Sequence, residues 1–295
     1  MKKVIVVVGP TAVGKTKLAV KLAKKYNCDI ISGDSVAVYK RLDIGSAKPT
    51  IEEIDGVKHY LIDHLEPTEQ YDVASFQKEA RKIIDEKDLS IICGGTGLYV
   101  QSVLFDYEFK ARKRDFDFNK QFDDLSNEEL YELLKQKDPS ISEERIHPNN
   151  RKRVLRALEI LDDTNQSINE FNNKNKPVYD YFIVYLSMPR EILYERIGKR
   201  VDIMINDGLI DEVKSLYDDG IYPHAIGYSE LISYFNGEIT LESAIEDIKK
   251  NTRHLAKRQE TWFRNQLNSH FYDASKDCFD EIINDIDRWL KWEYI

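Results

Sequence analysis

The feature that most constrains this chain is a phosphate-binding pattern near its N-terminus. The pattern G-x-x-x-x-G-K-[ST] is present as Gly9, Pro10, Thr11, Ala12, Val13, Gly14, Lys15 and Thr16. A β-branched run at 4–8 precedes it and apolar residues at helical spacing follow at 17–26, which predicts a strand, a loop and a helix. In that context backbone N–H groups and the helix N-terminus bind an anion, Lys15 reaches the outer phosphate, and the Thr16 hydroxyl can hold Mg²⁺. We therefore expect a di- or triphosphate at residues 9–16, bound by a kinase, an NTPase or a transferase.

The composition is that of an ordinary globular protein. With 295 residues, 42% of them hydrophobic, the chain can form one large domain with an insertion or two modest domains. No apolar run approaches the roughly twenty residues of a membrane span, and the N-terminus opens directly into a strand. We therefore predict a cytoplasmic protein without signal peptide or membrane anchor. The cysteines Cys28, Cys93 and Cys278 are too few and too scattered for a disulfide framework or a zinc cluster.

The charge distribution is uneven. The net charge of -9 argues against indiscriminate nucleic-acid binding, because a negative field repels phosphate. Residues 145–156 nevertheless contain basic residues and no acidic one, and residues 249–264 carry six Lys or Arg against Glu260 alone. The second segment carries Trp262 and Phe263 next to its last residue, Arg264. These segments are either solvated helix faces or parts of a groove that faces RNA, and charge alone leaves both interpretations open.

The order of strands and helices predicts an α/β fold. Strand candidates at 29–32, 89–93 and 181–187 follow the first strand, with helical segments such as 72–86 between them. This alternation predicts a P-loop NTPase-like, mostly parallel sheet flanked by helices. Because the carboxyl ends of parallel strands meet at one rim, we expect the loops 9–16, 33–35 and 94–97 to converge there.

A charged, helical segment interrupts this alternation. We predict a P-loop catalytic core over 1–110 and 178–295, with helices up to the C-terminus, and a mainly helical insertion over 111–177. Within the insertion we expect helices at 126–137 and 151–162, the first capped by Ser126 with Glu129 three residues later.

Several side chains near the predicted rim could carry chemistry. Asp34 is either a base or Mg²⁺ ligand, or a turn residue, and position alone does not decide between them. Residues 94–97 form either a ligand-binding loop with one hydroxyl, that of Thr96, or a tight turn. Arg196 and Arg200, one helical turn apart, could clamp an anion, although surface helices often carry such pairs. The six histidines show no metal-ligand spacing.

Taken together, the motifs resemble those of the tRNA dimethylallyltransferases. They are GPTAVGKT (9–16), GDSVAVYKRLDIGSAKP (33–49), CGGTGLY (93–99), RKRVLRALE (151–159), HAIGYSE (224–230) and TRHLAKRQETWFR (252–264). The likeness keeps the family's motif order over nearly the whole chain. It implies transfer of a dimethylallyl group from dimethylallyl diphosphate to N6 of adenosine 37 beside the tRNA anticodon.

The resemblance also implies roles for individual residues. Asp34 would accept the proton of the attacking amine, Thr96 would lie near the reacting diphosphate oxygen, and Lys15 and Arg200 would stabilise the departing diphosphate. Residues 9–16 would bind the donor, with Mg²⁺ at Thr16.

The residues that the resemblance assigns to the tRNA anticodon stem-loop are Asp34, Ser35, Val36, Ala37, Asn150, Arg151, Lys152, Arg153, Val154, Gly227, Tyr228, Arg253 and Arg258. The insertion would close over this arm, and we expect a monomer because the arm must enter from outside. This chain has Ala37 where the family usually has glutamine, and Ser229 where it usually has a basic residue. Two other activities stay open: prenylation of free adenine nucleotides, and phosphorylation of a small molecule.

Overall fold

The computed structural model describes residues 1–107, 109, 116–167 and 176–291, which form two compact units. The larger unit combines Met1–Leu104 with Pro177–Ile295, and the smaller unit is Phe105–Lys176. The boundary expected at 110 and 111 lies outside the described residues. Residues 168–175 of the predicted insertion also lie outside the described residues.

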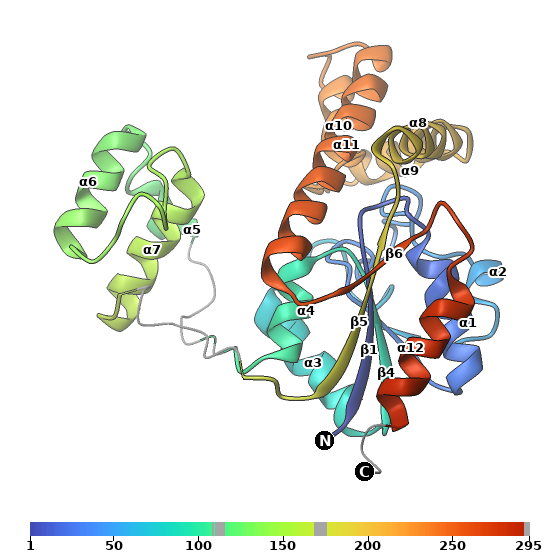
Figure 1. The fold of residues 1–295 in the computed structure, drawn as a ribbon. Helices are drawn as coiled ribbons and strands as arrows, with labels where there is room; N and C mark the ends of the chain where they lie inside the picture. Colours follow the sequence, from blue (N-terminus) through green and yellow to red (C-terminus); the bar gives the residue numbers. More distant parts are fainter. Residues whose placement is uncertain (108, 110–115, 168–175, 292–295) are drawn as a thin grey trace. The chain divides into compact units, whose positions relative to one another are not determined.

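A six-stranded sheet forms the centre of the larger unit, and its strand pairs are parallel (Figure 1). In spatial order the strands are β3 (His59–Tyr60), β2 (Ile30–Ser32), β4 (Leu89–Cys93), β1 (Lys3–Val8), β5 (Asp180–Ser187) and β6 (His270–Asp273). Residues 4–8 of β1 are fully buried because neighbouring strands and covering helices surround them. The predicted α/β class with a mostly parallel sheet is confirmed.

Two strands depart from the sequence-based expectation. β6 lies in the C-terminal part of the core, for which we expected helices up to the C-terminus, so that expectation is wrong at His270–Asp273. This strand lies at the edge of the sheet and buries only Tyr272, so its sequence lacks the apolar run of an interior strand. β3 at the opposite edge has two residues, too few for any periodicity.

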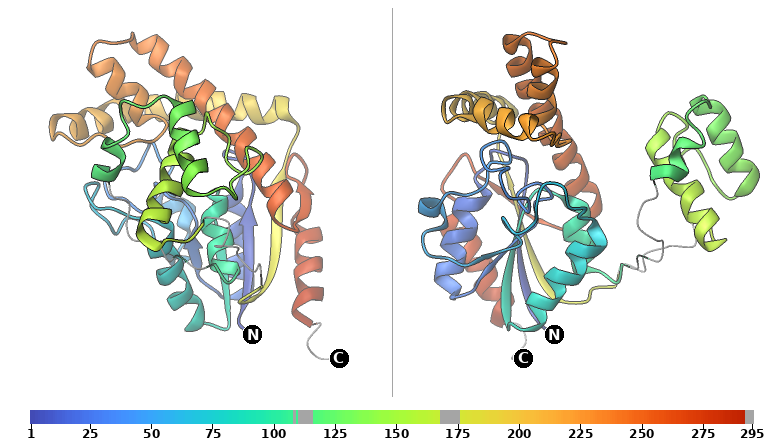
Figure 2. Two further views of the ribbon diagram at one scale, coloured as in Figure 1. Left: turned by 90° about the vertical axis from the view of Figure 1, so that its left-hand side faces the viewer. Right: turned by 180° about the vertical axis from the view of Figure 1, so that it is seen from behind.

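Helices cover both faces of the sheet (Figures 1 and 2). They are α1 (Lys15–Tyr26) and α12 (Phe279–Lys291) on one face, and α3 (Val73–Asp85) and α4 (Gly97–Leu104) on the other. Ile5 and Val7 of β1 share one core with Leu22 of α1 and Ile282 of α12. The side chains between them in sequence point to the opposite face, since strand side chains alternate.

A group of helices lies beyond the carboxyl ends of the strands (Figure 1). It contains α8 (Arg190–Asn206), α9 (Leu209–Asp218), α10 (Tyr228–Phe235) and α11 (Leu241–Gln266), and a short helix α2 (Ile51–Ile54) follows the loop after β2. Leu42 from that loop packs into the core of this group with Leu209 and Leu231. In the described ranges, no helix has both the length and the apolar character needed to cross a membrane.

The smaller unit has its own apolar core. Its helices are α5 (Phe116–Lys120), α6 (Asn127–Lys137) and α7 (Arg151–Thr164). Leu130 and Leu134 of α6 are buried against Val154 and Leu158 of α7. The predicted helices 126–137 and 151–162 are confirmed, and so is the capping box, because Ser126 and Glu129 exchange hydrogen bonds between side chain and backbone.

Candidate active site

The predicted phosphate loop connects β1 to α1. Gly14 has a φ of 106°, a region that favours glycine, and this conformation turns the loop into α1 at Lys15. The N-terminus of α1 therefore faces the loop and supplies the positive end of the helix dipole. Thr11 donates its backbone N–H to Gln259 Oε1 at 2.9 Å, so α11 contacts the loop directly.

Lys15 is partly buried beneath this loop. Its Nζ donates to the Pro10 carbonyl oxygen at 2.9 Å. Burial, with a smaller contribution from Arg200, lowers the Lys15 pKa to about 8, although Cys93 and Asp34 oppose the shift. A desolvated ammonium next to a second cation is an electrostatic arrangement that an anion would stabilise.

Asp34 follows β2 and has a defined structural role. Its Oδ1 accepts hydrogen bonds from the backbone N–H groups of Val36 at 2.8 Å and Ala37 at 3.2 Å. No described residue forms a hydrogen bond with Oδ2, and Asp34 lines a cavity. The turn and base interpretations of this residue are therefore compatible, because one oxygen holds the turn while the other can accept a proton.

The loop after β4 lies against the loop after β2. Thr96 donates its backbone N–H to the Gly33 carbonyl oxygen at 3.3 Å, and its Oγ1 has a longer contact of 3.4 Å with Ser35 Oγ. On the other side, Gln259 Nε2 donates to the Gly95 carbonyl oxygen at 3.1 Å. The loops 9–16, 33–35 and 94–97 therefore lie close together, as the parallel sheet predicts.

A cavity of about 430 Å³ joins these groups, and all its lining residues belong to the larger unit. Lys15, Asp34, Thr96 and Arg200 line its polar part. Burial lowers the pKa of Arg200, while Glu53 and Asp34 oppose this shift. The apolar residues that line the same cavity include Ile197, Val201, Met204, Leu209, Ile248 and Leu255. The cavity thus offers a cationic anion site, one carboxylate and an apolar wall.

Thr16 lines a smaller cavity of about 100 Å³, which shares Lys15 and Asp34 with the larger one. Among the described residues, no group of three or more His, Cys, Asp or Glu side chains is arranged to hold a metal ion. A cation at Thr16 would therefore need oxygen ligands from a bound phosphate compound and from water, an arrangement that Mg²⁺ commonly adopts.

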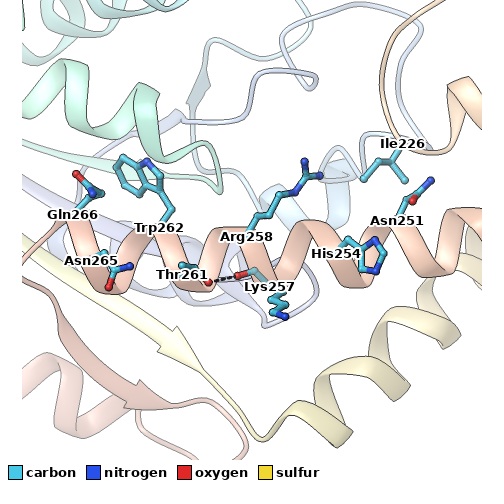
Figure 3. Close-up of a pocket in the computed structure, with 9 residues that line it drawn as sticks. All are labelled: Ile226, Asn251, His254, Lys257, Arg258, Thr261, Trp262, Asn265 and Gln266. Atoms are coloured by element: carbon cyan, nitrogen blue, oxygen red, sulfur yellow. Dashed lines mark hydrogen bonds between the residues drawn. The ribbon is translucent and has the colours of Figure 1, made fainter. Parts of the chain in front are cut away.

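A second cleft, of about 800 Å³, runs along α11 (Figure 3). Its lining residues are Ile226, Asn251, His254, Lys257, Arg258, Thr261, Trp262, Asn265 and Gln266. Figure 3 shows Arg258 and Trp262 extending from one side of the helix and Lys257 from the other. Arg258 also lines the 430 Å³ cavity, so the cleft and the cavity meet at this residue. Two cations and one indole suit a nucleic-acid strand.

The basic residues predicted at the start of α7 have different surroundings. Lys152 and Arg153 are exposed, and Asn150 caps the helix by accepting the Arg153 N–H at 3.3 Å. Arg151 instead donates to the carbonyl oxygens of Leu125 at 2.7 Å and of Phe122. Val154 is fully buried. In the smaller unit, the side chains of Lys152 and Arg153 are therefore the accessible cations at this helix start.

The remaining predicted tRNA residues also differ in exposure. Ser35, Val36 and Gly227 line the 430 Å³ cavity. Ala37 and Tyr228 are buried, so the Tyr228 side chain has a packing role, and its hydroxyl donates to Glu212. Arg253 on α11 is partly exposed and Ser229 is exposed.

Gln259 and Glu212 are two site-organising residues that the sequence interpretation missed. Gln259 lies within the basic segment 249–264, but nothing in its position indicates that its amide bridges two loops. Glu212 on α9 accepts three consecutive backbone N–H groups, those of residues 43–45, at 2.8 to 3.1 Å. A glutamate inside an amphipathic helix carries no local signal for such a contact, because its partners lie about 170 residues away in sequence.

Comparison with known proteins gives consistent matches. The family model described as IPP transferase matches residues 37–266. A protein of Anoxybacillus flavithermus named tRNA dimethylallyltransferase is 48% identical over 304 residues, covering 99% of this chain and 97% of that protein. The crystal structure of a tRNA delta(2)-isopentenylpyrophosphate transferase from Staphylococcus epidermidis is 41% identical, with a TM-score of 0.73 over 98% of this chain and 99% of that one. Structures of a eukaryotic dimethylallyltransferase acting on tRNA match with a TM-score of 0.82 and 29% identity, over 98% of this chain and 77% of that one.

Proposed function

This chain belongs to the IPP transferase family, and we propose from this premise that it is a tRNA dimethylallyltransferase. It transfers a dimethylallyl group from dimethylallyl diphosphate to N6 of adenosine 37 beside the tRNA anticodon and releases diphosphate. The observation that carries this proposal is the 430 Å³ cavity, in which Lys15 and Arg200 lie with Asp34 and an apolar wall. Allylic transfer uses all three features, because the cations bind the diphosphate, the carboxylate accepts a proton and the apolar wall holds the prenyl group.

The donor binds with its diphosphate at residues 9–16. Lys15 and Arg200 neutralise the diphosphate, and the N-terminus of α1 adds its dipole. The dimethylallyl group lies along apolar residues such as Val201 and Met204. Cations placed where charge develops on the leaving group accelerate its departure, since their positions cost no reorganisation during the reaction.

The reaction exchanges one bond for another. The bond between the allylic carbon and the diphosphate oxygen breaks, both its electrons leave with diphosphate, and the adenine N6 forms a bond to that carbon. Asp34 accepts the N6 proton at Oδ2, the oxygen that does not hold the turn. Thr96 lies across the same cavity, where its hydroxyl donates to the bridging oxygen or to the base.

Mg²⁺ would be held by the Thr16 hydroxyl together with diphosphate oxygens and water. It would neutralise charge on the leaving diphosphate. The residues present fit this role because Thr16 directly follows Lys15 at the start of α1.

The tRNA anticodon stem-loop binds along α11 and at the start of α7. The cleft at Lys257, Arg258 and Trp262 provides charge for the backbone and a ring for base stacking. Lys152 and Arg153 are exposed on the smaller unit and contact further phosphates. We assign this unit the role of closing over the anticodon arm, and we expect a cytoplasmic monomer.

The test is incubation of the protein and Mg²⁺ with labelled dimethylallyl diphosphate and either an unmodified anticodon stem-loop or AMP, followed by mass analysis. The proposal expects one added dimethylallyl group on the stem-loop adenosine. Transfer to AMP alone would instead assign the chain to free nucleotides, and absence of transfer to both acceptors would overturn the proposed function. Repetition with the target adenosine replaced by guanosine controls for the site of modification.

A further inference from the structure

Helix α11 approaches the loop after β4 on both sides of Thr96. A Cβ atom on Gly95 would lie 2.2 Å from Gln259 Nε2, and one on Gly97 would lie 2.2 Å from Trp262 Cε3. A side chain on Gly95 would displace the Gln259 amide, and one on Gly97 would displace the Trp262 ring. Thr96 is therefore the one residue of this short turn that presents a side-chain hydroxyl, and its two neighbours are packed tightly against a single helix.

Gln259 connects this turn to the phosphate loop. Its Oε1 accepts the backbone N–H of Thr11 at 2.9 Å, and its Nε2 donates to the Gly95 carbonyl oxygen at 3.1 Å. Both partners are backbone atoms, one in the loop that binds the donor and one beside Thr96. The backbone N–H of Thr11 is already bonded to Gln259, so this N–H supports the loop and is not a donor to the diphosphate. Gln259 also lines the 430 Å³ cavity.

We propose that Gln259 is a positioning residue for dimethylallyl transfer. Its amide holds the phosphate loop at Thr11 and the turn at Thr96 at a fixed separation, so that the leaving diphosphate and the Thr96 hydroxyl are aligned. This inference rests on the proposed function. A displacement of about 1 Å between reacting groups can cost about 10²-fold in rate. One side chain that sets the distance between two loops can therefore control the rate without touching either substrate's reacting atoms.

The test compares Gln259→Met with the wild-type protein. Methionine keeps the length and helix propensity of glutamine but makes neither hydrogen bond. We expect kcat to fall by about tenfold or more, with the KM for the stem-loop within about twofold. Tm should fall by several degrees, because two backbone groups lose their partners, while the protein stays folded at the assay temperature. Inorganic pyrophosphate, measured by calorimetry, should bind several-fold more weakly. Gln136→Ala, an exposed helical glutamine of the smaller unit, is the control for which we expect no change.

Gln259→Glu separates the two bonds. The carboxylate can still accept from Thr11 but cannot donate to the Gly95 carbonyl oxygen, so we expect kcat below that of the wild-type protein. Wild-type kcat in this variant would show that the bond to Gly95 is dispensable and would overturn the two-loop proposal.

Two further results would count against the inference. If kcat and pyrophosphate affinity of Gln259→Met stay within about twofold of the wild-type values, Gln259 does not position the site. If kcat falls only in proportion to the folded fraction measured at the assay temperature, the role is structural. Should the wild-type protein transfer nothing to the stem-loop, the proposed function fails, and pyrophosphate affinity of the folded variants alone then decides the role of Gln259.

Discussion

The hydroxyl of Tyr228 donates a 2.6 Å hydrogen bond to Oε1 of Glu212. The same carboxylate accepts the backbone N–H groups of residues 43–45. A Cβ atom on Gly45 would lie 2.5 Å from the Tyr228 ring, so the ring and the loop are in direct contact. This contact joins the motif at 33–49 to the motif at 224–230 and sets the loop at Ser46 and Ala47, which lines the cavity. The buried Tyr228 therefore supports the loop that contributes Ser46 and Ala47 to the cavity.

Tyr228→Phe should lower the free energy of unfolding by about 1.5 to 3 kcal/mol, since it removes one hydrogen bond to a charged group. Urea denaturation measures this change. Tyr222→Phe is the matched control, because Tyr222 is exposed, and its effect should stay below about 0.5 kcal/mol. Equal effects of the two substitutions would contradict the assigned contact.

Asp34→Asn should lower kcat by about 10²- to 10⁴-fold, because the amide cannot accept the N6 proton. Asparagine is preferable to alanine here, since its side-chain oxygen can still accept from Val36 and Ala37 and preserve the turn. Pyrophosphate and stem-loop affinities, measured by calorimetry and filter binding, should remain close to wild type. The exposed Asp124→Asn serves as control, and wild-type turnover in Asp34→Asn would exclude Asp34 as the base.

Pyrophosphate affinity should weaken as the pH rises above about 8, the pKa to which burial lowers the Lys15 ammonium. The charged form binds the anion and is present below this pH. The free energy of unfolding depends on pH in the opposite direction. Between about 8 and 10.5 the unfolded chain holds a proton that folded Lys15 has lost, so this group makes folding more favourable as the pH rises.

The measurement for Lys15 is calorimetry with pyrophosphate on either side of pH 8, using Lys15→Arg as comparator. Arginine stays charged throughout, so the ratio of the two affinities cancels the titration of pyrophosphate itself. A ratio that does not change with pH would refute a lowered Lys15 pKa.

Arg153→Ala should weaken stem-loop binding and reduce the salt slope of log K by about one unit, because one phosphate contact is lost. Arg151→Ala should instead destabilise the smaller unit by about 1 to 3 kcal/mol, since the carbonyl oxygens of Leu125 and Phe122 lose their donor. Filter binding at several salt concentrations and urea denaturation distinguish the two variants. If both lose RNA affinity equally while both remain stable, this division of roles is wrong.

The strand, loop and helix around residues 9–16 and the parallel character of the sheet were predictable from local sequence. Residues 9–16 combine a β-branched strand, a glycine loop and a helix start within one short segment, so neighbouring residues carry the whole signal. The parallel sheet follows from alternating strands and helices. Asp34 and Thr96 could then be placed at one rim, since loops after parallel strands meet there.

What each side chain does at that rim depended on contacts between distant segments. Sequence did not separate Arg151, bonded to carbonyl oxygens, from the exposed Arg153, because both lie in the same basic run. β6 was missed because an edge strand that buries one residue has little periodicity.

The sequence by itself determined the fold class, the family and the residue types of the anion site, because these are recorded in patterns of adjacent residues. Only the tertiary structure decided that Gln259 bridges Thr11 and Gly95, and that Glu212 holds residues 43–45. The physical reason is that these hydrogen bonds join a helical side chain to backbone atoms far away in sequence. Every residue except proline carries the same backbone N–H and C=O groups, so no local sequence pattern predicts which of them a distant side chain will bind.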